Sequence, residues 1–88
     1  MSETGEFLLR TRERRGISKY AVAAASGVSH GNLFRIERGE RFPTPDVINR
    51  LLRTYDLSEG ERALLFRHVS NDLTRAYDAA IYGDAGAR

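Results

Sequence analysis

The stretch 19–38 constrains the fold more than any other part of the chain, because a single glycine separates two short segments with helical patterns. The first segment, 19–26, ends at Gly27, where a left-handed backbone would stop a helix. Ser18 stands before the first segment and Ser29 before the second, and each hydroxyl is a candidate helix N-cap. The pattern predicts two short helices that meet at a tight corner around Gly27.

The second of these helices is predicted to have a buried and an exposed face. Leu33 and Ile36, three residues apart, form an apolar stripe that would face a core. The outward side presents four positions, which are His30, Gly31, Asn32 and Arg35. These positions are available to contact a partner.

Helical patterns continue through the chain and predict an all-α fold of five helices. We expect a first helix at about 4–15, a loop at 40–43 and a fourth helix that starts at Thr44-Pro45-Asp46. A last helix starts at Ser58, with Glu61 completing a capping box, and the polar run 70–72 could divide it into two. His68 on this helix is expected at the surface. Phe42 is expected in the core. The alternative is an exposed Phe42 that contacts a sugar of a nucleic-acid backbone.

The composition narrows the class of protein. The 88 residues allow one modest core, and the absence of cysteine excludes a disulfide framework and a thiolate metal site. No apolar run approaches the roughly 20 residues of a membrane span. Residues 27–31 fit the G-x-S-x-G pattern of serine hydrolases, but a helical pattern precedes Ser29 where that elbow requires a strand. We expect a cytoplasmic protein with no enzymatic activity, cofactor, metal or membrane contact.

Positive charge is concentrated on the part of the chain that carries the corner. The net charge is only +2, but residues 10–41 hold eight basic and three acidic side chains. From residue 61 to the end, four basic side chains balance four acidic ones. Binding to phosphates requires such a distribution, although a solvated basic face would look the same.

The glycine, alanine and aliphatic residues of this region resemble those of the lambda-repressor-like family of helix-turn-helix regulators, also called the Cro or xenobiotic-response-element type. The resemblance covers about residues 7–66 and rests on Gly16-Ile17-Ser18-Lys19, Val22-Ala23, Gly27-Val28-Ser29, Leu33, Ile36-Glu37-Arg38-Gly39 and Pro43. It implies a five-helix DNA-binding domain, here with an extended or additional C-terminal helix.

The resemblance also implies roles for individual side chains. Phosphate contacts fall to Lys19, Ser29, Arg38, Arg41 and Thr44, and base contacts to His30, Gly31, Asn32 and Arg35. Gly31 either lets the backbone approach the groove or is a tolerated surface glycine. Arg12 and Glu37 are expected to form a structural ion pair. Lys19 and Gly31 replace the residues that the family usually has at these positions.

The last helix carries an apolar stripe that continues past the expected five-helix core. We assign a homodimer interface to its members Leu65, Val69, Leu73, Ala76, Tyr77, Ala80 and Ile81, since monomers rarely expose such a patch. Alternatively, the stripe folds back on the first helix. The chain then divides into a helix-turn-helix domain at 1–69, a helical extension at 70–82 and a flexible tail at 83–88.

Together these features predict a sequence-specific transcriptional regulator that binds double-stranded DNA. We expect a homodimeric repressor, associated with the nucleoid, that places residues 29–38 in the major groove at each half of a pseudo-palindromic operator. The alternative is a protein-interaction adapter or antitoxin-like partner that binds through the C-terminal apolar helix, with DNA binding secondary.

Overall fold

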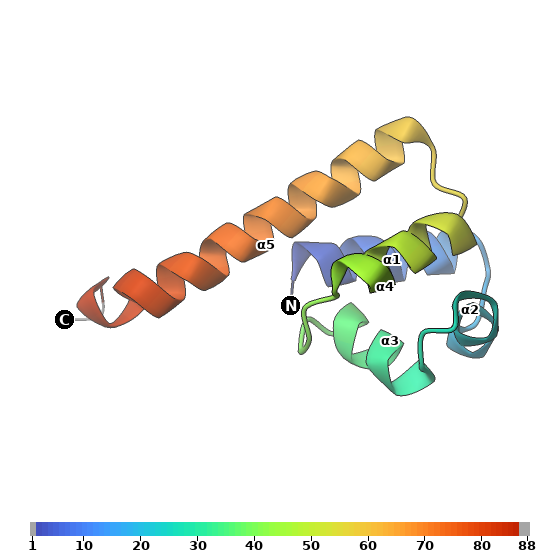
Figure 1. Ribbon diagram of the computed structural model, residues 1–88, viewed down its shortest axis with the longest axis horizontal. Helices are drawn as coiled ribbons and strands as arrows, with labels where there is room; N and C mark the ends of the chain where they lie inside the picture. Colours follow the sequence, from blue (N-terminus) through green and yellow to red (C-terminus); the bar gives the residue numbers. More distant parts are fainter. Residues whose placement is uncertain (1, 87–88) are drawn as a thin grey trace.

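The computed structural model describes the backbone of residues 2–86 and the side chains of residues 2–82. Over this range the chain forms five α-helices and no strand, which confirms the all-α prediction. They are α1 (Glu3–Arg14), α2 (Lys19–Ser26), α3 (His30–Glu37), α4 (Pro45–Thr54) and α5 (Glu59–Gly86). α1 to α4 gather at one end of the molecule, and α5 crosses them and extends well beyond (Figure 1).

Serine and threonine hydroxyls cap the N-termini of α2 to α5 at the residues that the sequence predicts. The hydroxyls of Ser18, Ser29 and Thr44 each accept a hydrogen bond from the backbone N–H three residues later, at 3.1, 3.1 and 3.2 Å. Ser58 and Glu61 form the predicted capping box, in which each side chain accepts from the other residue's backbone N–H. These bonds satisfy N–H groups that lack an intrahelical partner at a helix start. They explain why such short helices begin at definite residues.

Gly27 forms the corner between α2 and α3 in the predicted left-handed conformation, with a φ of 77°. Arg50 of α4 donates a hydrogen bond to the Ser26 carbonyl at 3.2 Å. Its guanidinium lies 2.9 Å from the position that a Cβ on Gly27 would occupy. A side chain at position 27 would therefore meet both backbone strain and Arg50.

The core joins all five helices. Leu33 and Ile36 are buried in it, which confirms the predicted inward stripe of α3. Leu65 has 0% of its surface exposed, so the prediction that it lies in a dimer interface is wrong, because the second turn of α5 closes the core. The buried members are Leu8, Val22, Val28, Leu33, Ile36, Ile48, Leu51, Leu52, Tyr55, Leu57 and Leu65.

α1 approaches the end of α3 closely at Gly5, which is buried. A Cβ added to Gly5 would overlap the carbonyl oxygen of Ile36 and lie 2.9 Å from that of Glu37. The absence of a side chain at this position therefore sets the spacing between α1 and the C-terminal end of α3.

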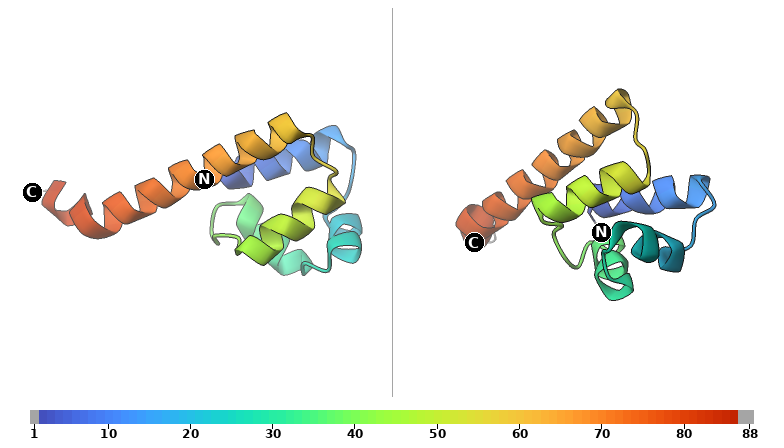
Figure 2. Two further views of the ribbon diagram at one scale, coloured as in Figure 1. Left: turned by 45° about the horizontal axis from the view of Figure 1, so that its top comes forward. Right: turned by 45° about the vertical axis from the view of Figure 1, so that its right-hand side comes forward.

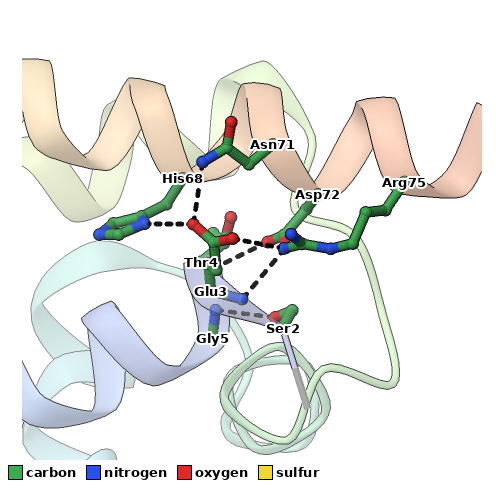
Figure 3. Close-up of polar contacts among 8 residues, drawn as sticks. All are labelled: Ser2, Glu3, Thr4, Gly5, His68, Asn71, Asp72 and Arg75. Atoms are coloured by element: carbon green, nitrogen blue, oxygen red, sulfur yellow. Dashed lines mark hydrogen bonds and ion pairs between the residues drawn. The ribbon is translucent and has the colours of Figure 1, made fainter.

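α5 is unbroken through residues 70–72, so the predicted division into two helices does not occur. The buried Asp72 carboxylate instead accepts hydrogen bonds from the backbone N–H groups of Glu3, at 3.1 Å, and Thr4, at 2.8 Å. Burial alone would raise the pKa of Asp72, but the hydrogen bonds outweigh it and hold the pKa below its usual value. A carboxylate from α5 thus caps α1 at the positive end of its dipole (Figure 3).

Glu3 adds further contacts between α1 and α5, and we call the contacts of Glu3 and Asp72 together the clamp. Its carboxylate lies 2.8 Å from His68 Nδ1, 3.1 Å from Asn71 Nδ2 and 2.7 Å from an Arg75 guanidinium nitrogen (Figure 3). The contacts to His68, Asn71 and Arg75 lower the pKa of Glu3 from 4.5 to about 2, with His68 contributing most. His68, which the sequence predicts at the surface, is half-buried, and its imidazole contacts Glu3 in this network.

Beyond Arg75, α5 leaves the rest of the fold. Figures 1 and 2 show its last turns extending past the other helices in every view, and the molecule measures 46 × 27 × 22 Å. The helix continues to Gly86, into the segment 83–88 that the sequence predicts to be a tail. Residues 87 and 88 of that segment lie outside the described residues.

Candidate nucleic-acid interface

The outward face of α3 holds the four residues predicted to contact bases. Gly31 and Arg35 are exposed, whereas His30 and Asn32 are half-buried. α3 lies beside α2 at the surface of the bundle, with α1 and α4 between it and α5 (Figures 1 and 2). The fold thus presents α3 on a side of the molecule that the long helix leaves open.

Phe34 is an exposed aromatic residue on α3 that the sequence analysis missed. The Lys19 amine lies 4.5 Å from the centre of its ring, and the Arg38 guanidinium lies 5.1 Å from it. These cation–π contacts hold two side chains that are predicted to bind phosphate over the aromatic ring of Phe34. The helical spacing could have shown that position 34 faces outward with Gly31 and Arg35.

Tyr20 is a second aromatic residue that the sequence analysis missed, and 74% of its surface is exposed. Its ring stacks on that of His30, with centroids 4.2 Å apart and planes inclined by 19°. The stack joins the first turns of α2 and α3. It restrains His30, so a base contact at this position would involve Tyr20 as well.

The loop after α3 contributes to the same surface. Arg41 donates a hydrogen bond to the Asn32 side-chain oxygen at 3.1 Å, and Arg38 pairs with Glu40 at 2.5 Å. Thr44, at the end of this loop, caps α4. The structure therefore brings one predicted phosphate residue of the loop, Arg41, into contact with one predicted base residue of α3, Asn32.

Arg12 and Glu37 lie together, as the resemblance implies. Arg12 Nε is 2.7 Å and Nη2 3.1 Å from the two carboxylate oxygens of Glu37, which is buried. Arg12 also donates to the carbonyl of Ile17 at 3.0 Å. The hydrogen bond to Glu37 raises the pKa of Arg12, so the guanidinium stays charged. This pair fixes the end of α3 against α1 and the loop before α2.

The structure separates the basic residues of the stretch 10–41 into two groups. Arg10 pairs with Glu6, while Arg14 and Arg15 lie 3.9 and 3.5 Å from Glu61 on α5. Apart from Arg12, the remaining cations all lie on α2, α3 or the loop that follows, and they are Lys19, Arg35, Arg38 and Arg41. Glu40 pairs with Arg38 and offsets one of these four charges, which leaves a net charge of +3 (four cations less one carboxylate) around the outward face of α3.

The predicted dimer residues after Val69 are exposed, whereas Val69 itself packs against the core. The alternative in which the stripe folds back on α1 is wrong for these residues. Phe42 is also exposed, so its predicted core position is wrong. The exposed members of the stripe are Leu73, Ala76, Tyr77, Ala80 and Ile81.

Ser29 does not occupy a hydrolase elbow. The residues before it form α2 rather than a strand, and its hydroxyl accepts the capping bond from Asn32. Among the described residues, no three His, Asp or Glu side chains gather as metal ligands would. None of the described helices combines the length and apolar character needed to cross a membrane.

A family model described as a helix-turn-helix domain matches residues 3–65, from the start of α1 into α5. Comparisons with curated proteins and with solved structures gave no match. The matched residues include the Gly27 corner, the outward face of α3 and the pair of Arg12 with Glu37. The chain therefore belongs to the helix-turn-helix domain family, in agreement with its resemblance to the lambda-repressor-like regulators.

Proposed function

We propose that this protein is a sequence-specific transcriptional regulator that binds double-stranded DNA with α3 in the major groove. The observation that carries the proposal is the arrangement of α3, whose inner face is buried while four cations surround its outer face. An α-helix fits the width of the major groove, where each base pair presents its own pattern of donors and acceptors. The described geometry therefore offers both a reading helix and charge to hold the DNA backbone.

Phosphates are bound by the residues at the edges of this surface. Lys19, Arg38 and Arg41 supply positive charge, and Ser29 and Thr44 stand at the starts of α3 and α4. The first N–H groups of a helix and its positive dipole end favour an anion. These contacts supply affinity that is largely independent of sequence.

Bases are read by His30, Asn32 and Arg35, with Gly31 among them. Arginine favours guanine and asparagine favours adenine, and each good bidentate contact gives about 1–3 kcal/mol of discrimination. Arg41 donates a hydrogen bond to the Asn32 side-chain oxygen, which keeps a second lone pair for adenine, so Arg41 can stay in place while Asn32 binds the base. The phosphate contact of Arg41 and the base contact of Asn32 can therefore form together.

The active form is a homodimeric repressor in the nucleoid that occupies the two halves of a pseudo-palindromic operator. The exposed apolar residues of α5 support a second copy, because isolated monomers rarely leave such a patch uncovered. To bind both half-sites at once, the dimer must hold its two copies of α3 about one helical turn apart, roughly 34 to 36 Å. Repression follows when the dimer covers promoter DNA.

Fluorescence anisotropy with a selected duplex and a random duplex tests the assigned roles. Arg35→Ala should lose discrimination at one base pair, by roughly 5- to 150-fold, while Lys19→Ala should weaken binding to both duplexes and flatten the salt dependence. Arg53→Ala is the matched control, since Arg53 is an exposed arginine on α4 beside Arg62 of α5. It should change neither property.

Two results would overturn the proposal. If Arg35→Ala and Lys19→Ala lost affinity equally on both duplexes, the division into base and phosphate contacts would be wrong. If the unmodified protein bound every duplex alike, the adapter or antitoxin-like alternative would be favoured instead.

A further inference from the structure

The exposed apolar surface of α5 continues into a groove of the bundle. Phe66, Leu73, Tyr77 and Ile81 are 51%, 42%, 65% and 62% exposed and lie on one side of the helix. Beside them is an apolar cavity of about 410 Å³, closed on the other side by α4 and the loop before it. Its lining consists of Phe42, Pro43, Pro45, Ile48, Asn49, Phe66, Val69 and Leu73. We use the name α5 surface for this groove together with the side of α5 that carries Phe66, Leu73, Tyr77 and Ile81.

Two residues of opposite charge, Arg67 and Asp78, lie along the same edge of the α5 surface. Arg67 and Asp78 are 11 residues apart, so an α-helix places them about 20° apart around its axis and about 16 Å apart along it. This distance is too long for a pair within one chain. Among the ion pairs of residues 2–82, none includes Arg67 or Asp78.

We propose that the α5 surface binds the α5 surface of a second copy of this chain in antiparallel orientation, with the two-fold axis next to Leu73. A two-fold axis perpendicular to the helices keeps like flanks together and reverses their direction. Arg67 of one copy then lies beside Asp78 of the other, and this pair occurs twice. In a parallel dimer the two residues would remain about 16 Å apart along the axis.

The same orientation covers the groove. With the axis next to Leu73, residues 76–81 of the second copy lie opposite Phe66 and the groove beside it. This segment contains Tyr77 and Ile81, the most exposed large apolar residues of the stripe, and the small residues Ala76 and Ala80. Small side chains let the second helix approach, while the two large ones meet the apolar lining.

The available area is on the scale of a stable dimer. A whole aromatic side chain has a surface of about 150–250 Å². Phe42, Phe66 and Tyr77 expose 41%, 51% and 65% of their surfaces, so their exposed area adds up to about 300 Å². Leu73, Ile81, the alanines and the groove walls add to this value. A standard interface buries roughly 800 Å² per partner, which the α5 surface can approach.

This inference rests on the proposed homodimer, and disulfide cross-linking tests its orientation directly because the chain has no cysteine. Leu73→Cys should form a covalent dimer on mild oxidation, since Cβ atoms next to a two-fold axis meet their own copies. Ile81→Cys is the matched control. In the antiparallel dimer its two copies lie about 25 Å apart along the axis and do not cross-link.

Cross-linking of both variants would indicate a parallel dimer and would overturn the proposal. Cross-linking of neither, with the unmodified protein monomeric in analytical ultracentrifugation, would overturn it as well. Circular dichroism on both variants verifies that the helices are intact. Binding of the unmodified protein to a selected duplex is measured in parallel, so that loss of the dimer is distinguished from failure of the DNA-binding proposal.

A charge exchange gives a second test. Arg67→Asp and Asp78→Arg should each raise the dimer dissociation constant about tenfold, because each creates like charges across the interface. The double variant should recover the original dissociation constant. If the double variant were as weak as the single ones, the pairing of these two positions would be wrong.

Discussion

The corner formed by α2 and α3 and the last turns of α5 differ in what they leave exposed. At the corner, the apolar stripe of α3 is buried and cations surround the surface. In α5 after Asp72, large apolar side chains are exposed, while the cation Arg75 is paired with Glu3 and Asp72. Each region therefore lacks a different partner. A polyanion suits the first and another apolar surface suits the second.

The two regions also differ in how they are held. Serine caps, a left-handed glycine, a core stripe and a buried ion pair all fix α3. Among the described residues, the polar contacts that join α5 to α1 near its distal part are those of Glu3 and Asp72. Disrupting the first set of contacts should unfold the domain, and disrupting the last turns of α5 should alter assembly alone.

The largest effect is expected from breaking the ion pair that fixes α3. Glu37→Ala would leave the Arg12 guanidinium, whose side chain is 13% exposed, without its counter-charge. We expect a loss of about 3 kcal/mol in the free energy of unfolding, measured by urea denaturation. The matched control is Glu6→Ala, which removes the exposed pair with Arg10 and should cost less than about 1 kcal/mol. Equal losses would show that the buried pair has no special role.

The second largest effect on stability is expected from acid, which protonates Glu3 in the clamp between α1 and α5. Glu3 has a pKa of about 2 in the folded chain, against an ordinary value of 4.5, so its contribution to stability is complete above pH 4.5. That contribution is lost as the pH falls toward 2, because the folded state binds the proton more weakly. Thermal denaturation between pH 2 and 7 measures it. Glu3→Gln should flatten the dependence, and an unchanged slope would argue against the clamp.

Two tyrosines of α5 offer a matched comparison at the distal end. Tyr77 and Tyr82 are 65% and 64% exposed, but the helical spacing places only Tyr77 on the side of Leu73. Tyr77→Ala should raise the dimer dissociation constant by about tenfold, and Tyr82→Ala should leave it unchanged. Sedimentation velocity measures both. An equal effect of the two substitutions would contradict the assignment of one face of α5 to the interface.

The smallest effect concerns Gly31 and separates the two interpretations of this residue. A Cβ on Gly31 would meet no atom within 4 Å, so Gly31→Ala should raise the free energy of unfolding by up to about 1 kcal/mol. If the backbone approaches DNA here, the same variant binds a selected duplex more weakly. Gly60→Ala on α5, also in open space, is the control that should not affect binding. Unchanged binding by Gly31→Ala would identify a tolerated surface glycine.

The corner could be predicted from sequence because its determinants are local. Ser18, Ser29 and Gly27 act on backbone groups within a few residues, and Leu33 and Ile36 lie within one turn. The pair of Arg12 with Glu37 is a contact between distant segments, and only the family resemblance suggested it.

The clamp and the aromatic contacts could not be predicted in the same way. Asp72 caps a helix 68 residues earlier, and the sequence alone suggested a helix break at that position. The stack of Tyr20 on His30 and the cations over Phe34 depend on how α2 and α3 cross. Leu65 was misplaced because a periodic pattern does not show where a core ends along a helix.

The central claim is that α3 reads a defined DNA sequence as part of a two-fold dimer. Selection of bound duplexes from a random pool at physiological salt, followed by sequencing, tests it most directly. The predicted result is one enriched motif that is an inverted repeat, with half-sites separated by about 10 base pairs. Recovery of the pool without an enriched motif would contradict sequence-specific reading by α3.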